Sequence, residues 1–234
     1  MAVTPEVLAE NVIPVLDHGF VALDGALASD LAVVNGARVS FNQASDELGD
    51  KDAGLIRFLM REKHGSPFEH GYFRFIVKAP LFVVREHHRH RAGHSYNEWS
   101  GRYSKIEPEF YVPENVRTQV GKPGSYSFEP VDAELAETTR EELQAVYEAA
   151  YATYERLVEQ GVARELARAA LPVGAYTEFY WTVNARALMN FVSLRASENA
   201  QREIRRYAEA VERFLADQMP ITHAAFLAND RTAP

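Results

Sequence analysis

The stretch GYFRFIVKAPLFVVREHHRHR, residues 71–91, decides the fold. Its first part, residues 71–78, alternates with a period of two and puts Phe73 and Phe75 on one face, which predicts a β-strand. Pro80 suits the first turn of a helix, because its missing N–H would have no partner there. We therefore expect a strand that is followed directly by a helix running to the end of the stretch.

Outward from this stretch, helical and strand patterns alternate. In the first half we expect a short hairpin at 14–24, helices at 30–41 and 53–62, and a surface connection at 110–131. In the second half we expect a helix at 132–160 ended by Gly161, a short helix at 163–171 and a strand at 176–183. A helix from Ala185 to about Ala196, capped by Asn184, and a last helix from about Ser197 to Met219 complete the chain of expected elements. The apolar residues of the long helix lie close to one stripe: Leu135, Leu143, Val146, Tyr147, Ala150, Tyr154, Leu157 and Val158. This order predicts a single mixed α+β domain, residues 1–234, with a small central, mostly antiparallel sheet flanked by helices.

The composition fits one water-soluble domain. The 234 residues allow one sizeable core and are short for two. A net charge of −8 argues against sequence-independent nucleic-acid binding, so we expect no nucleic-acid partner. No apolar run approaches the roughly 20 residues that span a bilayer, and the N-terminal segment lacks the basic start of a signal peptide. We expect a cytoplasmic protein with no membrane partner.

A basic stretch begins where the chain leaves the apolar run PLFVV. Half of the eight histidines lie between Arg85 and Arg102, and Arg89 would share a helix face with Arg85 and His88. Concave, partly buried sites form where a chain leaves a core, and neutral groups such as Ser100 could orient a polar heterocycle. A solvated basic helix end is the alternative, since runs of charge are usually solvated faces.

Phosphate suits this stretch, because the planar fork of arginine donates two parallel hydrogen bonds. His90 and His94 are four residues apart, but the neighbouring arginines would repel a divalent cation, so we expect no metal. Neither GxGxxG nor GxxxxGK[ST] occurs, so side chains must hold any nucleotide. A second set of arginines, which fits a ligand with more than one phosphate, comprises Arg164, Arg168, Arg186 and Arg195.

The segment RHR at residues 89–91, followed by a serine and an Arg-Tyr pair, resembles the signature of the flavin-dependent thymidylate synthases. Further segments are similar to family segments in the family's order: HGSPFEH (64–70), VKAPLFVVRE (77–86), NEWSGRYSKI (97–106), EFYVP (109–113), LARAALP (166–172), FYWTVNARALMNFVSLRA (179–196) and AQREI (200–204). The resemblance covers most of residues 14–220, the expected core of the domain. Two features depart from the family pattern: eight residues, AGHSYNEW, separate RHR from Ser100 where seven are usual, and Glu86 stands where a glutamine is common.

The resemblance implies methylation of deoxyuridine monophosphate (dUMP) to thymidylate (dTMP). The carbon would come from 5,10-methylenetetrahydrofolate and the reducing equivalents from NADPH through FAD. The chain contains no cysteine, so it has no thiolate to attack the pyrimidine, whereas a reduced flavin can deliver a hydride. The resemblance also implies a homotetramer whose sites are shared between subunits.

Residue roles follow from the matching positions. Arg195 matches the family arginine at the pyrimidine, where a fixed cation favours the ionised ring, and is the expected catalytic residue. The positions implied for dUMP are Glu86, Arg89, Glu98, Ser100, Gly101, Arg102, Arg168 and Arg195. The positions implied for FAD are His64, Ser66, Arg89, His90, Arg91, Glu98, Asn184, Arg186 and Asn190. Ser100 receives a binding role only, because no relay of histidine and carboxylate accompanies it in the sequence.

Two rival hypotheses remain at this point. A non-catalytic module that binds anions or nucleic acid could use the same basic stretch, and a purified protein without flavin colour would favour it. A flavoprotein oxidoreductase of the same architecture with a different acceptor is the second. Turnover of dUMP to dTMP would exclude that one.

Overall fold

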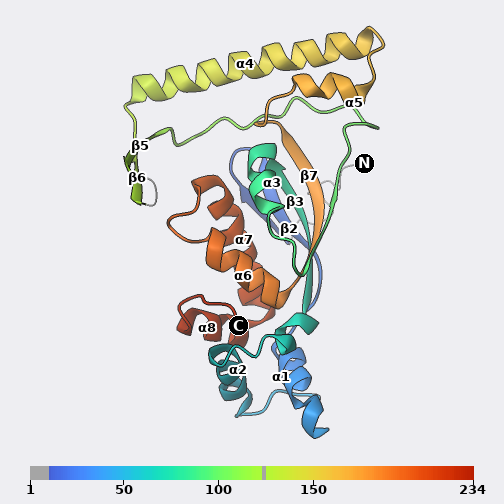
Figure 1. The fold of residues 1–234 in the computed structure, drawn as a ribbon, viewed down its shortest axis with the longest axis vertical. Coiled ribbons are helices and arrows are strands. Elements are labelled where there is room, and N and C mark those ends of the chain that lie inside the picture. Colours follow the sequence, from blue (N-terminus) through green and yellow to red (C-terminus); the bar gives the residue numbers. More distant parts are fainter. Residues whose placement is uncertain (1–10, 123–124) are drawn as a thin grey trace.

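The computed structural model describes residues 11–122 and 125–234, so residues 1–10 of the expected domain lie outside it. A five-stranded antiparallel sheet in the order β1-β2-β3-β7-β4 forms the centre, and β5 and β6 form a separate hairpin (Figure 1). The strands are β1 (Val12–Val15), β2 (Gly19–Leu27), β3 (Tyr72–Pro80), β4 (His94–Glu98), β5 (Arg117–Lys122), β6 (Ser125–Pro130) and β7 (Tyr176–Asn184). The helices are α1 (Asp30–Arg38), η2 (Val39–Phe41), α2 (Asp52–Arg61), η3 (Ser66–His70), α3 (Leu81–His87), α4 (Ala133–Glu159), α5 (Arg164–Ala167), η4 (Arg168–Ala170), α6 (Ala185–Arg195), α7 (Arg202–Gln218) and α8 (Pro220–Ala228). The α+β expectation is confirmed.

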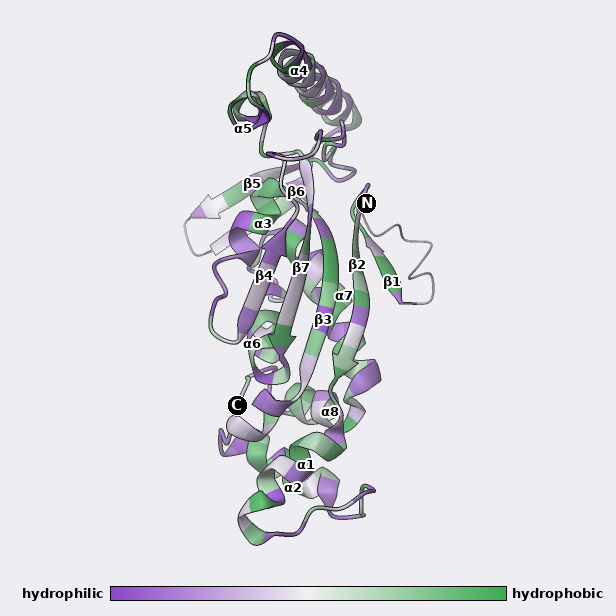
Figure 2. Ribbon diagram, turned by 90° about the vertical axis from the view of Figure 1, so that its right-hand side faces the viewer, coloured by the Kyte–Doolittle hydropathy of each residue, from purple (hydrophilic) through white to green (hydrophobic). Residues whose placement is uncertain are grey.

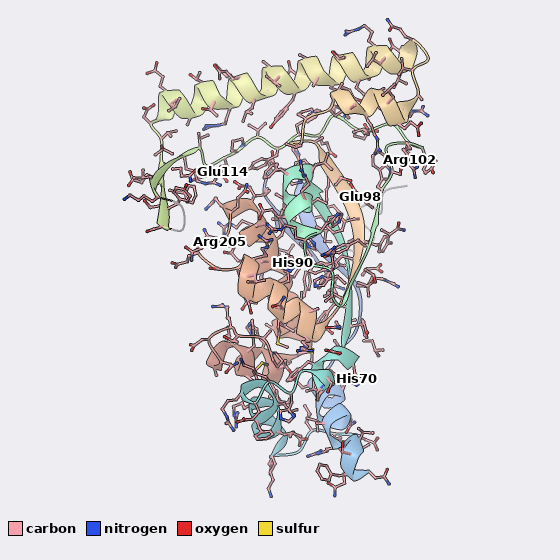
Figure 3. All side chains as sticks on the ribbon, in the orientation of Figure 1. His70, His90, Glu98, Arg102, Glu114 and Arg205 are labelled. Carbon is pink, nitrogen blue, oxygen red and sulfur yellow. The ribbon has the colours of Figure 1, made fainter. Side chains whose placement is uncertain are left out.

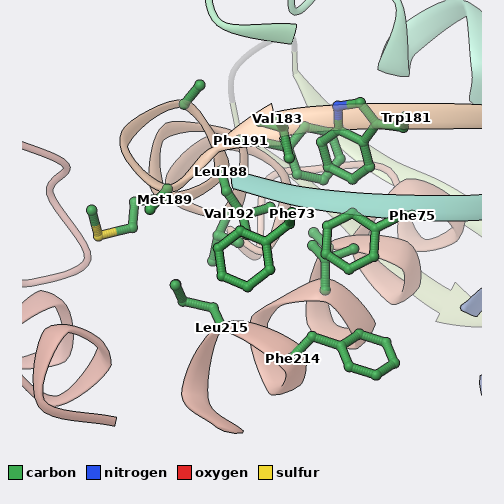
Figure 4. Close-up of a cluster of buried hydrophobic side chains, with 14 of the residues drawn as sticks. Phe73, Phe75, Trp181, Val183, Leu188, Met189, Phe191, Val192, Phe214 and Leu215 are labelled. Atoms are coloured by element: carbon green, nitrogen blue, oxygen red, sulfur yellow. The ribbon is translucent and has the colours of Figure 1, made fainter. Parts of the chain in front are cut away.

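The core lies where β3 and β7 meet helices α6 and α7. Phe73 and Phe75 of β3 are fully buried, whereas Tyr72 on the other face is 44% exposed, as the alternation predicts. The ring of Phe75 packs 5.3 Å from Trp181 of β7 and 5.8 Å from Phe214 of α7, between ring centroids (Figure 4). This packing fixes the strand after which the basic stretch begins.

The helix expected over residues 80–91 is much shorter in the structure. Pro80 has an extended backbone and pairs with Tyr176 as the last residue of β3, so the helix begins one residue later. α3 ends at His87, after which Arg89 N–H donates to the Glu86 carbonyl at 3.3 Å in a tighter turn. The expectation that Arg85 and Arg89 share a helix face is therefore wrong.

Three elements were not indicated by the sequence patterns, and one expected helix begins later than predicted. β4 pairs with β7 at the edge of the sheet, and the expected surface connection contains the β5–β6 hairpin. The last expected helix begins at Arg202 rather than near Ser197, because residues 197–201 form a loop. Helix α8 follows it, with Pro220 in its first turn, where the missing N–H costs nothing.

Helix α4 lies with α5 at one end of the sheet (Figure 2). It begins as expected, because the Asp132 side chain accepts a hydrogen bond from Leu135 N–H at 2.8 Å. It ends before Gly161, whose positive φ of 86° suits glycine. The expected apolar stripe is only partly buried, since Leu135 and Val146 are 52% and 59% exposed. Within residues 11–122 and 125–234, no helix is long and apolar enough to cross a membrane.

Candidate functional site

Arg195 is the best-fixed of the predicted site residues. It is the last residue of α6, and its guanidinium reaches the end of α3. Its Nη1 donates to Glu86 Oε2 at 2.8 Å, its Nη2 donates to the Glu86 carbonyl at 3.3 Å, and its Nε donates to His90 Nε2 at 3.0 Å. A guanidinium has five N–H groups, so two remain for another ligand.

His90 is neutral in this arrangement. Because Nε of Arg195 can only donate, His90 Nε2 must accept, and the ring proton then lies on Nδ1. Burial, and then the positive charge of Arg195, lower the pKa of His90 to about 4. The site therefore contains one fixed cation at this point rather than two.

His94 is a second histidine beside His90, and it is held by Trp181. Trp181 Nε1–H donates to His94 Nδ1 at 3.0 Å, and burial lowers the pKa of His94 to about 4. The hydroxyl of Tyr96 donates to the His90 carbonyl at 2.9 Å. These three residues hold the segment around His90 against the sheet, and the expected site did not include them. Their signal in the sequence is the alternation of His94, Tyr96 and Glu98, which is typical of a strand.

Two opposing effects act on the pKa of Glu86. Its carboxylate pairs with Arg195, which favours the charged form, yet burial outweighs this attraction and raises the pKa of Glu86. The negative charge of Glu203 on α7 acts in the same direction as burial. Glu86 therefore fixes Arg195 at an electrostatic cost, and the two side chains are 24% and 16% exposed.

The uridylate positions of the loop after β4 and of η4 gather at a cavity of about 370 Å³. Glu98, Gly101 and Arg168 line it, together with Trp99, Thr177 and other residues. Glu98 is held by Thr177, whose hydroxyl donates to Glu98 Oε1 at 2.8 Å. Thr177 was not among the expected residues. Arg195 does not line this cavity, so the chain presents the predicted uridylate residues in two groups.

Ser100 and Arg102 lie beside the same cavity in the chain. Arg102 donates to the Ser100 hydroxyl through its backbone N–H at 3.4 Å and through its Nε at 3.3 Å. The guanidinium of Arg102 also lies 4.9 Å from the ring centroid of Tyr103. Among the described residues, no histidine side chain forms a hydrogen bond with the Ser100 hydroxyl.

The predicted flavin residues lie in separate places along the molecule. Arg89 and Arg91 are exposed beyond α3, and Asn190 is exposed on α6. The Asn184 side chain accepts from Ala187 N–H at 2.8 Å and so caps α6. Figure 3 shows this spread, with Arg102, Glu98, His90 and the η3 residue His70 following one another along the long axis.

His64, Ser66 and Arg186 form a further group near η3. Arg186 donates from Nη1 to Glu69 at 2.6 Å and from Nε to the Pro234 carbonyl at 2.7 Å. It also packs on the chain between His64 and Ser66, because a Cβ at Gly65 would lie 2.4 Å from Arg186 Nε. Both His64 and Ser66 are exposed.

The residues present fit a flavin dinucleotide in one respect. Arg89 and Arg91 are exposed cations whose forked donors match a diphosphate. Arg186 fits less directly, since Glu69 and Pro234 already bind it. Among the residues that the structure describes, no group of three or more histidines and carboxylates could hold a metal ion.

The additional residue between RHR and Ser100 precedes β4. The ladder between β4 and β7 runs from His94↔Val183 to Glu98↔Phe179 without a register shift. Gly93 just before it has a positive φ of 77°, and its carbonyl accepts from Asn184 N–H at 3.2 Å. The eight residues between RHR and Ser100 thus comprise the turn at Ala92 and Gly93, the strand from His94 to Glu98, and Trp99, and none of them forms a bulge in the ladder.

Comparisons with known proteins match the family that the sequence resembles. Residues 23–221 match the family described as thymidylate synthase complementing protein. The flavin-dependent thymidylate synthase of Thermotoga neapolitana is 49% identical over 216 residues, which cover 92% of this chain and 94% of the relative. That of Streptomyces coelicolor is 47% identical over 228 residues, which cover 92% of this chain and 93% of the relative.

Solved structures are similar over nearly the whole chain. A UMP/dUMP methylase, PolB from Streptomyces cacaoi bound with 5-Br dUMP, matches with a TM-score of 0.87 and 44% identity, over 95% of this chain and 100% of that chain. The same protein bound with 5-Br UMP gives a TM-score of 0.86 and 43% identity, over 94% of this chain and 100% of that chain.

Proposed function

Because this chain belongs to the family of flavin-dependent thymidylate synthases, we propose that it converts dUMP to dTMP by reductive methylation. The chain is an enzyme of the methyltransferase class. In the proposed reaction 5,10-methylenetetrahydrofolate donates the carbon, and NADPH supplies the reducing equivalents through FAD. The uridylate analogue in the related methylase supports dUMP as the substrate.

The fixed position of Arg195 is the observation that carries this proposal. Glu86 and the neutral His90 orient its guanidinium and leave two N–H donors free. A preorganised cation at the pyrimidine stabilises negative charge as it develops on the ring, and it costs no reorganisation during the reaction. Arg195 is thus the proposed catalytic residue, and Glu86 and His90 position it.

The cavity lined by Glu98, Gly101 and Arg168 supports uridylate binding. A Cβ at Gly101 would lie 3.7 Å from Arg168 Cδ, so the arginine stem packs directly on the loop after β4. Among the described residues, Arg168 uses only its Nε, in a contact of 3.4 Å with the Glu165 carbonyl. Its terminal nitrogens are free for a phosphate. We assign dUMP to Glu86, Arg89, Glu98, Ser100, Gly101, Arg102, Arg168 and Arg195.

The flavin would be held by the second set of positions. We assign FAD to His64, Ser66, Arg89, His90, Arg91, Glu98, Asn184, Arg186 and Asn190, with the exposed arginines on the diphosphate. When bound, the flavin supplies the hydride that the pyrimidine receives. This chain contains no cysteine that could attach it covalently, so acid denaturation should release all of it.

A homotetramer with shared sites accounts for the separation of the residue groups. In one chain, the cavity with Arg168 does not include Arg195, and His64 lies near η3 at the other end of the sheet. A shared site would join one chain's arginine group to another chain's histidine group. The oligomeric state, measured by light scattering, tests this part of the proposal.

Tritium release from carbon 5 of labelled dUMP tests the reaction itself. Release should require both NADPH and 5,10-methylenetetrahydrofolate. A yellow protein without release would instead fit a flavoprotein oxidoreductase with another acceptor. A colourless protein that binds only anions would fit the non-catalytic alternative.

Arg195→Ala tests the catalytic assignment. Loss of a preorganised donor at developing charge should lower turnover about 100-fold or more, and dUMP binding should weaken less than turnover falls, because the contact strengthens in the transition state. Mass spectrometry of quenched enzyme should find no pyrimidine attached to Ser100. Unchanged turnover of Arg195→Ala, or an adduct on Ser100, would contradict the assignment.

A further inference from the structure

A cavity of about 470 Å³ lies between the β5–β6 hairpin and the start of α7. In Figure 3, Arg205 marks the end of α7 that faces this hairpin. Its lining combines two aromatic rings with three arginines, and none of these residues belongs to the positions assigned above to dUMP or FAD. The residues that the argument uses are Arg117, Tyr126, Phe128, Glu198, Arg202 and Arg205.

The hairpin supplies an aromatic surface. Tyr126 and Phe128 are 43% and 50% exposed and lie on one face of β6, two residues apart. Arg117 on β5 lies 5.5 Å from the Phe128 ring centroid. Exposed rings of this kind stack on planar heterocycles, as they do on the bases of single-stranded nucleic acids.

The helix supplies free positive charge. Arg117 is neutralised, because Glu203 accepts from its Nη1 at 3.0 Å and from its Nη2 at 2.9 Å. Arg202 forms no hydrogen bond or ion pair with the described part of the chain. Arg205 reaches Glu209 only at 3.7 Å, and its buried Nε has no hydrogen-bond partner in the structure described. Both arginines lie in the first turn of a 17-residue helix, whose N-terminus also favours anions.

The cavity adjoins the catalytic arginine along the chain. Glu198 and the two residues after it line the cavity, and they follow Arg195 by only a short loop. Glu203, which fixes Arg117, is also close enough to Glu86 for its charge to raise the pKa of that residue. Glu198 is the one carboxylate among the lining residues, whereas three arginines line the cavity, of which Arg202 has no ion-pair partner among the described residues and Arg205 has a long one with Glu209.

We propose that this cavity binds the adenosine end of NADPH, with the adenine ring on Tyr126 and Phe128 and the 2′-phosphate on Arg202 and Arg205. Arginine favours phosphate here because its fork donates two parallel hydrogen bonds. The choice of NADPH as the ligand rests on the proposed function. The expectation of a planar ring and an anionic group rests on the aromatic and arginine side chains that line the cavity. A consequence is selectivity for NADPH over NADH, which lacks this phosphate.

Arg202→Gln in the flavin-loaded enzyme tests the proposal. We expect the NADPH concentration that gives half-maximal flavin reduction under anaerobic conditions to rise about tenfold, the effect of one lost charge-assisted contact. The value for NADH should change less than about twofold, since no phosphate contact is lost. Phe128→Ala should weaken both reductants, because the adenine ring is common to them.

Arg206→Gln is the matched control, since Arg206 is also on α7 but pairs with Glu209 at 2.9 Å and does not line the cavity. Calorimetry with adenosine 2′,5′-bisphosphate provides a readout without turnover: wild type should bind it and Arg202→Gln should bind it about tenfold more weakly. Equal effects of Arg202→Gln on NADPH and NADH, or equal effects of Arg202→Gln and the Arg206→Gln control, would overturn the proposal. Tritium release by enzyme reduced with dithionite should remain intact in Arg202→Gln, and its absence in wild type would instead contradict the proposed function.

Discussion

The sheet with α6 and α7, here called the body, and residues 110–171, here called the arm, bury their apolar residues very differently. Nine of the 17 residues of α7 are buried, whereas only Ala136, Tyr147 and Tyr154 are buried among the 27 of α4. Both helices have apolar residues at helical spacing. Spacing therefore reveals an apolar face, but it does not reveal whether the same chain covers that face.

The arm is attached to the body at a small second cluster. Phe110 and Tyr147 stack with centroids 4.9 Å apart, next to Ala175 at the start of β7. The predicted site is divided in the same way, because Arg195 belongs to the body and Arg168 to the arm. The difference teaches that the body holds the proposed catalytic residue in a fixed position, while the proposed phosphate ligand Arg168 lies on the less deeply packed arm.

Phe75→Ala should have the largest effect on the body. Phe75 is fully buried between Trp181 and Phe214, so truncation leaves a cavity and should lower the free energy of unfolding by about 3 to 5 kcal/mol. Val146→Ala on α4 is the matched change in the arm and should cost less than about 0.5 kcal/mol. Urea denaturation measures both. Comparable losses would mean that the α4 face is covered in solution.

Lowering the pH should reduce the stability of the body, because the folded protein disfavours the protonated form of His90. Its folded pKa of about 4 lies below the ordinary value of 6.5, so the unfolded chain binds the proton first as the pH falls. The contribution of His90 to the free energy of unfolding should therefore be complete above pH 6.5, fall by about 3 kcal/mol as the pH falls to 4, and level off below that.

His90→Gln should remove that part of the decline, since glutamine can still accept from Arg195 without titrating. His18→Gln, at an exposed histidine beside Asp17, should leave the decline intact. Unfolding free energies measured from pH 7 to pH 4 decide between the two. An unchanged profile for His90→Gln would mean that folding does not lower the pKa of His90.

Arg168→Ala probes the arm's share of the site. Loss of one charge-assisted phosphate contact should weaken dUMP binding by about 1.5 to 3 kcal/mol and leave FAD binding nearly unchanged. Arg164→Ala, four residues earlier and equally exposed, should have almost no effect on either ligand. Titration of both ligands into each variant provides the measurement. Equal losses of dUMP and FAD would assign Arg168 a structural role.

Ser100→Ala should have the smallest effect. Within the described residues the hydroxyl accepts two long hydrogen bonds from Arg102, at 3.3 Å from the charged Nε and at 3.4 Å from the backbone N–H, and a typical hydrogen bond contributes about 1 kcal/mol. Turnover at saturating dUMP should persist. A loss as large as that of Arg195→Ala would show that Ser100 takes part in the chemistry.

The body was more predictable from the sequence than the arm. β3 and β7 have alternating or aromatic-rich patterns because they are buried, and Asn184 and Asp132 cap helices as their side chains predict. β4 was not predicted, because the alternation of His94, Tyr96 and Glu98 is confined to five mostly polar residues at the edge of the sheet. The β5–β6 hairpin escaped because its glycine, proline and serine residues are equally typical of a loop.

The candidate site residues could be named from the sequence, but which of them lie next to one another could not. Arg195, Glu86 and His90 meet because α3 stops at His87, which no residue pattern in the basic stretch indicates. Thr177 and Trp181 belong to β7. Their side chains form hydrogen bonds with Glu98 and His94 because β4 pairs with β7. Contacts of this kind depend on strand order, which a local pattern does not contain.

The edge position of β4 has a consequence for how this protein can evolve. An interior strand has two ladders to keep in register, whereas β4 has one, with β7. A residue gained or lost at the Gly93 turn therefore disturbs a single set of pairings. We expect natural and engineered variants to differ in length here more readily than within an interior strand, because the rest of the sheet is not rebuilt.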